Sequence, residues 1–203
     1  YSLLGSIRAT SQMISYELAL GLAAVTVLLP VGSLRLDEVV LYQQGAWLGI
    51  LPRWNVFPQA IGFLVFMVAS FAETNRLPFD MPEAESELGA GYHTASSPVK
   101  CALFFMGEYM SMTTLSALAA TLFLGGWHLP GVPFVFGPLG NALLGFGILA
   151  AKVGAILLFF VWVRWSFPRF RFDQLLRLGW KVLLPLALAN FVLVAVLTLA
   201  GWL

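Results

Sequence analysis

The strongest constraint on this chain is its division into long apolar blocks. Runs of mostly Leu, Val, Ala, Phe and Gly, each about 17 to 25 residues long, alternate with shorter segments rich in Pro, Gly, Trp and polar residues. A helix of that length crosses the hydrocarbon of a bilayer. The chain is 60% hydrophobic and only 10% charged, whereas soluble domains carry about 25% charged residues. The pattern therefore predicts a membrane protein.

The apolar blocks predict an all-α fold, a polytopic membrane helix bundle that forms a single transmembrane domain over residues 1–203. Because unpaired backbone groups are not tolerated in lipid, each span is expected to be a helix. We predict about five transmembrane helices in this chain. They cover residues 13–31, 56–72, 102–125, 141–163 and 182–202.

Lys and Arg residues predict the orientation of these helices. The richer side of the membrane is expected to be cytoplasmic. That side would hold an acidic loop, residues 73–100, and a basic loop, residues 164–181. The other side has only Arg35 and Arg53. The basic residues assigned to the richer side are Arg8, Arg76, Lys100, Arg164, Arg169, Arg171, Arg177 and Lys181.

Acidic residues gather in and beside the stretch "ETNRLPFDMPEAESELGAGYH", residues 73–93. If the segment is helical, Glu83 and Glu87 lie one above the other at i and i+4, and carboxylates that close titrate as a coupled set. A solvated loop is the alternative. Apolar neighbours such as Leu77, Phe79 and Met81 favour a loop covered by protein. The gathered acids, six of the ten in the chain, are Glu73, Asp80, Glu83, Glu85, Glu87 and Glu108.

One basic residue, Lys152, is expected near the middle of the fourth span. A central Lys costs about 2.5–3.5 kcal/mol even on the lenient insertion scale, so its side chain should face the protein interior. By depth, Glu17 and Glu108 are its expected partners. A structural ion pair is one interpretation. Several such charges together favour a path for protons or ions.

Other chemistries find no support in the residue pattern. Cys101 is the single cysteine, so no disulfide framework or cysteine metal site is predicted. His93 and His128 lie far apart without a ligand spacing, and no basic patch with interleaved aromatics indicates nucleic-acid binding. We predict no metal and no catalytic side chain. Because the chain begins at Tyr1 without an initiator Met, we expect it to be a fragment.

Several motifs together resemble a known family. The stretches are "FAETNRLPFDMPEAESELGAGYH" followed by "ALFFMGEYM", "LLGSIRATSQMISYELALGL" near the start, "TLFLGGW", and "PRFRFDQLLRLGWKVLLPLALAN". They resemble the membrane subunit of proton-pumping NADH:quinone oxidoreductase, respiratory complex I, called subunit 1 in mitochondria and the H subunit in many bacteria. The resemblance covers essentially the whole chain and implies that the family's first helices are missing. It departs at Ala95 and Ser96, where the family often has an acid and an aromatic.

The resemblance implies roles for particular residues. Family members form much of a quinone chamber and carry a chain of acids from it into the membrane. By position, Asp80, Glu83, Glu85 and Glu87 match the loop part of that chain, with Glu73, Glu108 and Glu17 leading inward; Lys152 joins the expected proton path because of its depth in the fourth span. The matching chamber residues are Phe105, Met106 and Arg164, and the further candidates are Phe79, Arg76 and Arg8. The alternatives are helix packing for Phe79, Phe105 and Met106, and headgroup anchoring for Arg164.

The resemblance also implies partners. Quinone is the expected substrate, while NADH, FMN and iron–sulfur clusters belong on partner subunits, in a bacterial plasma membrane or mitochondrial inner membrane. One alternative is the membrane anchor of a related energy-converting hydrogenase, which would lack quinone. Another is a stand-alone ion transporter, for which the sequence lacks an inverted repeat. A purely structural scaffold would tolerate neutral residues at Glu17, Glu108 and Lys152.

Overall fold

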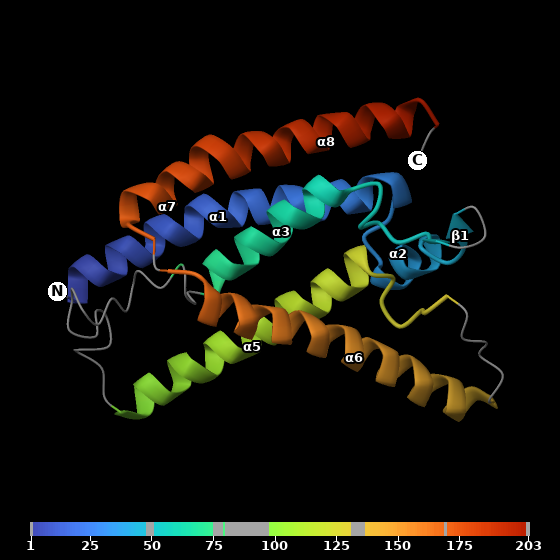
Figure 1. Ribbon diagram of the computed structural model, residues 1–203, viewed down its shortest axis with the longest axis horizontal. Coiled ribbons are helices and arrows are strands. Elements are labelled where there is room, and N and C mark those ends of the chain that lie inside the picture. Colours follow the sequence, from blue (N-terminus) through green and yellow to red (C-terminus); the bar gives the residue numbers. More distant parts are fainter. Residues whose placement is uncertain are drawn as a thin grey trace.

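The apolar blocks fold into long helices (Figure 1). The computed structural model describes residues 2–47, 51–74, 79, 98–130, 137–168 and 170–201. Its helices and strands are, in chain order, α1 (Ser2–Val31), α2 (Leu36–Tyr42), β1 (Ala46–Trp47), β2 (Leu51–Pro52), α3 (Ala60–Glu73), α5 (Pro98–Phe123), α6 (Gly137–Ser166), α7 (Phe172–Leu178), a π-helical turn η2 (Gly179–Leu183) and α8 (Leu184–Leu199). The segments α7, η2 and α8 follow one another as one helix.

Three of the five predicted spans are confirmed as helices that are long and apolar enough to cross a membrane. Among the described residues these are Ser6–Val31, Gly137–Ser166 and Asp173–Leu199. The predicted span 56–72 corresponds to α3, whose 14 residues reach only about 21 Å. Helix α5 has 26 residues but carries Glu108 and several hydroxyl side chains between Ser111 and Ser116, so it is less apolar than the other long helices.

The segment after α1 is more structured than the sequence predicted. Helix α1 ends where Gly32 adopts a φ of 69°, and the Gly32 amide donates to the Leu28 carbonyl at 3.0 Å. The short helix α2 and a two-stranded antiparallel ribbon then follow, with Ala46 opposite Pro52. The all-α prediction is therefore correct for the long elements and missed this ribbon.

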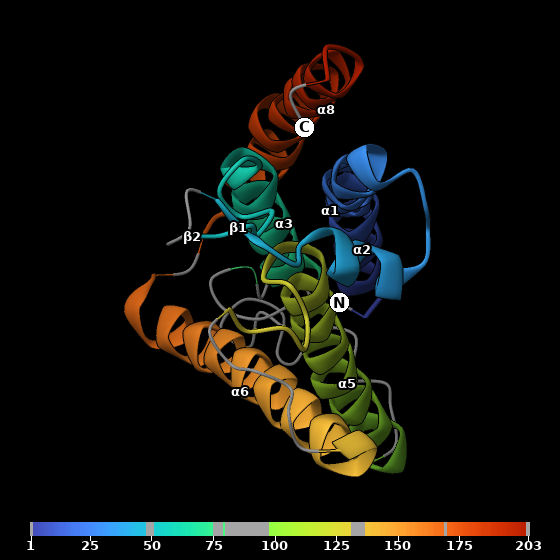
Figure 2. The same ribbon diagram turned by 90° about the vertical axis from the view of Figure 1, so that its right-hand side faces the viewer.

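The helices form two groups (Figure 2). Helices α1, α3 and α8 pack against one another, and α5 and α6 pack together on the side away from α8. Helix α3 joins the groups through aromatic rings. The centroid of Phe66 lies 5.5 Å from that of Phe123 on α5, and Phe71 lies 4.0 Å from Phe160 on α6. Helix α3 is therefore the central element of the bundle.

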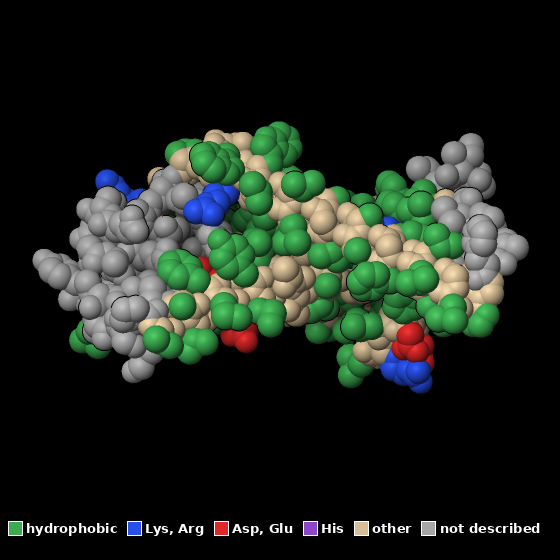
Figure 3. Space-filling view, turned by 90° about the horizontal axis from the view of Figure 1, so that it is seen from below, with side chains coloured by type: hydrophobic (Ala, Val, Ile, Leu, Met, Phe, Trp, Pro, Cys, Tyr) green, Lys and Arg blue, Asp and Glu red, His purple; other side chains and the backbone are tan. Residues whose placement is uncertain are grey.

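Apolar side chains cover much of the outer surface (Figure 3). On α6 alone, Leu143 and Phe146 are each 70% exposed, and Leu158 is 71% exposed. Soluble proteins rarely expose such continuous apolar area, so this surface fits contact with lipid or with other membrane proteins.

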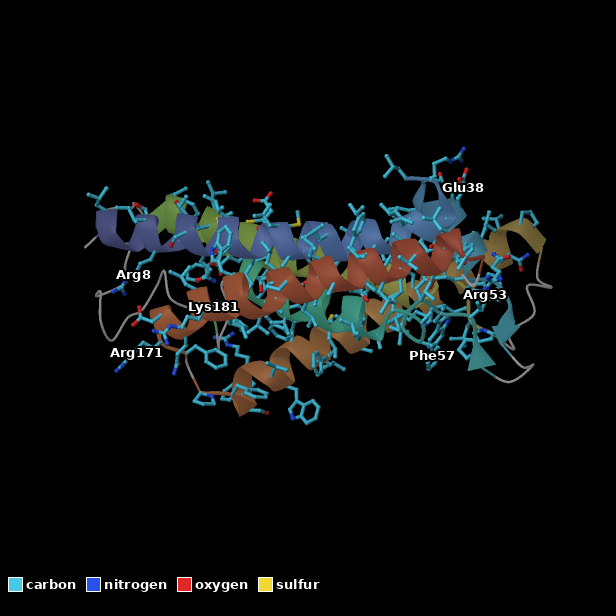
Figure 4. The ribbon with its side chains drawn as sticks, turned by 90° about the horizontal axis from the view of Figure 1, so that it is seen from above. Arg8, Glu38, Arg53, Phe57, Arg171 and Lys181 are labelled. Carbon is cyan, nitrogen blue, oxygen red and sulfur yellow. The ribbon has the colours of Figure 1, made fainter. Side chains whose placement is uncertain are left out.

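The described basic residues separate as the sequence predicted (Figure 4). Arg8, Arg171 and Lys181 lie toward the end of the molecule where α1 begins, whereas Arg53 lies toward the opposite end, as does Glu38. We call the first end the loop-side end because α3 finishes there, immediately before the acidic stretch. The other is the far end.

Candidate functional site

A side chain on the first part of α1 bonds to the chain just before and just after residues 75–78. Gln12 is fully buried, and its Nε2 donates to the carbonyl oxygens of Ala72 at 2.8 Å and Phe79 at 3.1 Å. Ala72 is near the end of α3, and Phe79 lies inside the acidic stretch. A single side chain therefore joins α1 to both sides of residues 75–78, whose own structure is outside the described residues.

The next turn of α1 binds the last helix. The Tyr16 hydroxyl, which is fully buried, donates to the Leu175 carbonyl at 2.9 Å, and Trp180 Nε1 donates to Ser15 Oγ at 2.8 Å. Gly179 in the π-helical turn packs directly against this part of α1, since a Cβ on it would lie 3.4 Å from the Ser15 Cβ, an ordinary contact distance. Residues 12, 15 and 16 lie on one helical face, since they are spaced by i+3 and i+4. This face fixes the loop-side end.

Phe79, predicted to line the quinone chamber, lies in the protein core. Its side chain is 4% exposed, with ring centroids 5.8 Å from Tyr16 and 5.5 Å from Phe170. This geometry matches the core-packing alternative for Phe79. Such packing also fixes the start of the acidic stretch against α1 and the chain before α7.

Two of the predicted path residues, Glu73 and Glu17, lie on neighbouring helices. Glu73 ends α3, and its Oε2 is buried without a hydrogen-bond partner among the described residues. Burial, followed by the negative charge of Glu17, which is exposed on α1, raises the pKa of Glu73 above its ordinary value. Glu108 on α5 is partly buried. None of the acidic side chains that the structure describes is fully buried.

Five of the predicted site residues in the acidic stretch lie outside the described residues. They are Asp80, Glu83, Glu85, Glu87 and Arg76. The prediction that protein covers this acidic loop therefore stays a prediction.

The remaining predicted chamber residues lie on α5 and α6. Phe105 is 39% exposed and Met106 62% exposed on α5. Arg164, on the last turn of α6, borders a small cavity of about 150 Å³ together with Tyr109, Met112, Phe160 and Val161. Pockets for drug-sized ligands usually reach about 300–1,000 Å³. A quinone chamber at this place would therefore need walls from outside these helices.

The structure corrects the predicted partners of Lys152. Its Nζ donates to three backbone carbonyls, those of Leu124 at 2.6 Å, Gly126 at 2.8 Å and His128 at 2.6 Å, and it lies 5.0 Å from the Trp54 ring centroid. These bonds use all three ammonium donors, so the expected pairing with Glu17 or Glu108 is wrong. The carbonyls follow the C-terminus of α5, where the helix dipole favours a cation.

Lys152 belongs to a network that closes the end of α5, which we call the α5 cap. Gln43 Nε2 donates to the carbonyls of Thr121 at 3.0 Å and Leu122 at 3.1 Å. Asn55 Nδ2 donates to Leu122 O at 3.0 Å, and the Val56 amide donates to Phe123 O at 3.2 Å. Helix C-termini leave carbonyls without intrahelical partners. Here those carbonyls are bonded inside the protein.

Gly126 makes the turn in the α5 cap possible. Its φ is 52°, and a Cβ at this position would approach the Val40 side chain to 2.6 Å. Neither Gln43 nor Asn55 was predicted from the sequence to be a functional residue. The sequence feature that could have indicated these two residues is an amide side chain beside an apolar block, because a buried amide needs a hydrogen-bond partner.

A second cavity, of about 540 Å³, has none of the predicted site residues in its lining. Trp127, His128, Asn141 and Phe146 are among the residues that line it, on the N-terminal half of α6 and after α5. Among the described residues, no group of three or more His, Cys, Asp or Glu side chains could hold a metal ion.

Comparisons with known proteins agree with the motifs. A sequence profile of the family described as NADH dehydrogenase matches residues 1–195. The chain is 48% identical over 202 residues to NADH-quinone oxidoreductase subunit 8 of Rhodothermus marinus, covering 96% of this chain and 59% of the relative. It is 48% identical over 200 residues to the H subunit of the NADH-quinone oxidoreductase of Protochlamydia amoebophila, covering 98% and 56%.

A third relative is one of the H subunits, numbered 1, of the NADH-quinone oxidoreductase of Geobacter metallireducens. It is 45% identical over 203 residues, which is 100% of this chain and 54% of the relative. The chain therefore spans about half the length of the curated relatives that it matches.

Proposed function

Because the chain belongs to the NADH dehydrogenase family, we propose that it is the membrane subunit through which an NADH:quinone oxidoreductase couples quinone reduction to proton translocation. One observation in the structure supports this proposal most directly. Glu73 holds a buried carboxylate oxygen without a hydrogen-bond partner among the described residues, and burial, followed by the charge of Glu17, raises its pKa. A carboxylate that is buried without a bonding partner favours uptake of a proton.

In this proposal the electron carriers belong to other subunits. NADH, FMN and iron–sulfur clusters sit on hydrophilic partners, and quinone is the substrate that touches this chain. The chain lies in a bacterial plasma membrane or a mitochondrial inner membrane. The loop-side end, with Arg8, Arg171 and Lys181, faces the cytoplasm or matrix, as the distribution of basic residues favours.

The proposed quinone chamber opens at the loop-side end between α5 and α6. Arg164 supplies a fixed positive charge at the small cavity that it borders, and Phe105 and Met106 offer exposed apolar surface on α5. Arg76 adds a second cation from the acidic loop. Neighbouring membrane and hydrophilic subunits complete the walls.

The proposed proton path begins in the acidic loop and enters the membrane through α3, α1 and α5. Asp80, Glu83, Glu85 and Glu87 form the loop part, and the inward part consists of Glu73, Glu17 and Glu108. Reduction of a quinone to a quinol takes up protons as well as electrons. Coupled carboxylates beside the chamber re-partition their protons when the charge there changes. Lys152 is assigned to the α5 cap, since its ammonium donors are already used.

The test replaces carboxylates at both ends of the molecule in the complete, assembled complex. Glu73→Gln keeps the size of the side chain and removes its charge, and Glu87→Gln does the same in the loop. Glu38→Gln is the matched control, because Glu38 lies at the far end (Figure 4) beside Arg35.

We expect coupled turnover and proton pumping to fall at least about tenfold, equivalent to about 1.4 kcal/mol, for Glu73→Gln and Glu87→Gln. Glu38→Gln should retain both activities. NADH oxidation with quinone and proton uptake by sealed vesicles are measured together, and the amount of assembled complex is the reference. Wild-type turnover and pumping in both loop-side variants, with normal assembly, would refute the coupling role.

A further inference from the structure

A second group of polar side chains is buried where α1, α3 and α8 meet. Gln59, which precedes α3, is 1% exposed, and Asn190 on α8 is 5% exposed. Gln59 Nε2 donates to the Thr26 carbonyl on α1 at 3.4 Å, but its Oε1 has no hydrogen-bond partner among the described residues, and neither has Asn190 Nδ2. One acceptor and one donor are therefore unused in an apolar interior.

Gly62 lies between the Asn190 amide and the first carbon of the Gln59 side chain. A Cβ built on Gly62 would lie 3.0 Å from Asn190 Nδ2 and 3.9 Å from the Gln59 Cβ. Gly62 therefore leaves the space that the Asn190 amide occupies. Gln59 and Gly62 are three positions apart at the start of α3, so both amide groups lie on the same side of this helix.

An unpaired buried donor or acceptor costs about 1–3 kcal/mol of stability. Here Gln59 Oε1 is an acceptor without a donor among the described residues, and Asn190 Nδ2 is a donor without an acceptor there. A buried polar atom in a native protein is usually bonded to protein or to ordered water. A metal cation does not fit, because the Asn190 Nδ2 group is a donor and no carboxylate is part of the group.

We propose that one ordered water molecule sits between Gln59 and Asn190, donating to Gln59 Oε1 and accepting from Asn190 Nδ2. The water links α8 to α3, and Gln59 extends the link to α1. Buried waters in proteins typically make about three hydrogen bonds to such groups. This site is independent of the proposed proton path, since neither side chain is titratable.

The direct test is a high-resolution electron cryomicroscopy map of the complete complex in lipid. The expected result is a separate density peak within hydrogen-bonding distance of both Gln59 Oε1 and Asn190 Nδ2, and the same peak missing in Asn190→Leu. A map in which the two amides bond each other directly would overturn the proposal. So would a map of that resolution with no peak between them.

Variants provide a second readout. Gln59→Leu and Asn190→Leu each leave the opposite amide unbonded, so each should lower the thermal midpoint of the complex, while the double variant should fall by less than the sum. Ser70→Ala is the control, because among the described residues buried Ser70 donates to the Phe66 carbonyl within α3. Additive losses for the two amides would overturn the link, and non-additive losses would support it.

Discussion

The two ends of the bundle differ in whether their buried polar groups have hydrogen-bond partners among the described residues. At the far end, the α5 cap bonds the carbonyls of the α5 terminus through Gln43, Asn55 and Lys152. At the loop-side end, a carboxylate oxygen of Glu73 is buried without a bond among the described residues. The far end is arranged for stability. The loop-side end retains groups whose protonation can change.

The exposed carboxylates at the far end make the same contrast. Arg35 Nη2 lies 2.7 Å from Asp37 Oδ2, and Arg35 Nε lies 3.6 Å from Glu38 Oε1. The hydrogen bond from Arg35 holds the pKa of Asp37 below its ordinary value. At the loop-side end, burial, followed by the negative charge of Glu17, raises the pKa of Glu73 above its ordinary value. A carboxylate that is paired with a cation keeps its charge. The protonation of a carboxylate without such a partner responds to changes in the charge nearby.

The largest effect that we expect comes from Lys152→Leu. This change leaves the carbonyls of Leu124, Gly126 and His128 without their donor in an apolar setting. Bonds from a charged donor are each worth about 1.5–3 kcal/mol, so the loss should reach about 3 kcal/mol or more. Little complex should assemble, and its thermal midpoint should fall.

A more conservative variant separates the α5 cap from a proton path. Lys152→Arg keeps the positive charge and several donors, and we expect it to recover part of the assembled complex, with turnover per complex close to normal. If Lys152→Leu instead assembled fully but lost pumping, Lys152 would return to the proton path and the contrast between the ends would fail.

The next effect comes from Gln12→Leu, which removes the bonds from α1 to Ala72 and Phe79. Interhelical hydrogen bonds in membrane proteins average about 0.6 kcal/mol, so the total loss should be about 1 kcal/mol. Stability should change little, because the aromatic packing of Phe79 remains. Turnover should fall more than stability, since the segment that leads into the acidic loop loses its position.

Thr10→Val provides the comparison for Gln12→Leu. It lies on the same helix, and its hydroxyl bonds only the Ser6 carbonyl one turn away, at an exposed position. Turnover and thermal midpoint of each assembled complex are the measurements. Equal turnover in Gln12→Leu and Thr10→Val would show that the Gln12 bonds do not position the loop.

The sequence predicted features that depend on long runs of one kind of residue. Three spans were correct because only an apolar helix fits their length and composition. The separation of Arg8 and Lys181 from Arg53 was also correct, because charge distribution is a property of whole segments. Such signals sum over many positions, so single exceptions do not hide them.

Features that depend on one contact between distant segments were missed. The predicted span from residue 56 begins instead at Ala60, because the Val56 amide is used at the end of α5 and the following turn is not helical. The partners of Lys152 were wrong for a similar reason. Every residue has a backbone carbonyl, so a sequence does not show which carbonyls will accept a bond. The acidic side chains of Glu17 and Glu108, in contrast, are evident from the sequence. Buried amides such as Gln12 and Gln43 were the available clue.

The smallest effect that we expect comes from Arg35→Ala, which removes the cation beside Asp37 and Glu38. The pKa of Asp37 should return upward toward its ordinary value, because the hydrogen bond that lowered it is gone. A depressed pKa in the folded state stabilises the protein at neutral pH, and that contribution is lost as the pH falls through the folded pKa. Here solvent screens the pair almost completely. Turnover, pumping and the pH dependence of the thermal midpoint should therefore match the unaltered complex, and a loss of pumping comparable with that of Glu73→Gln would show that carboxylates at both ends take part in coupling.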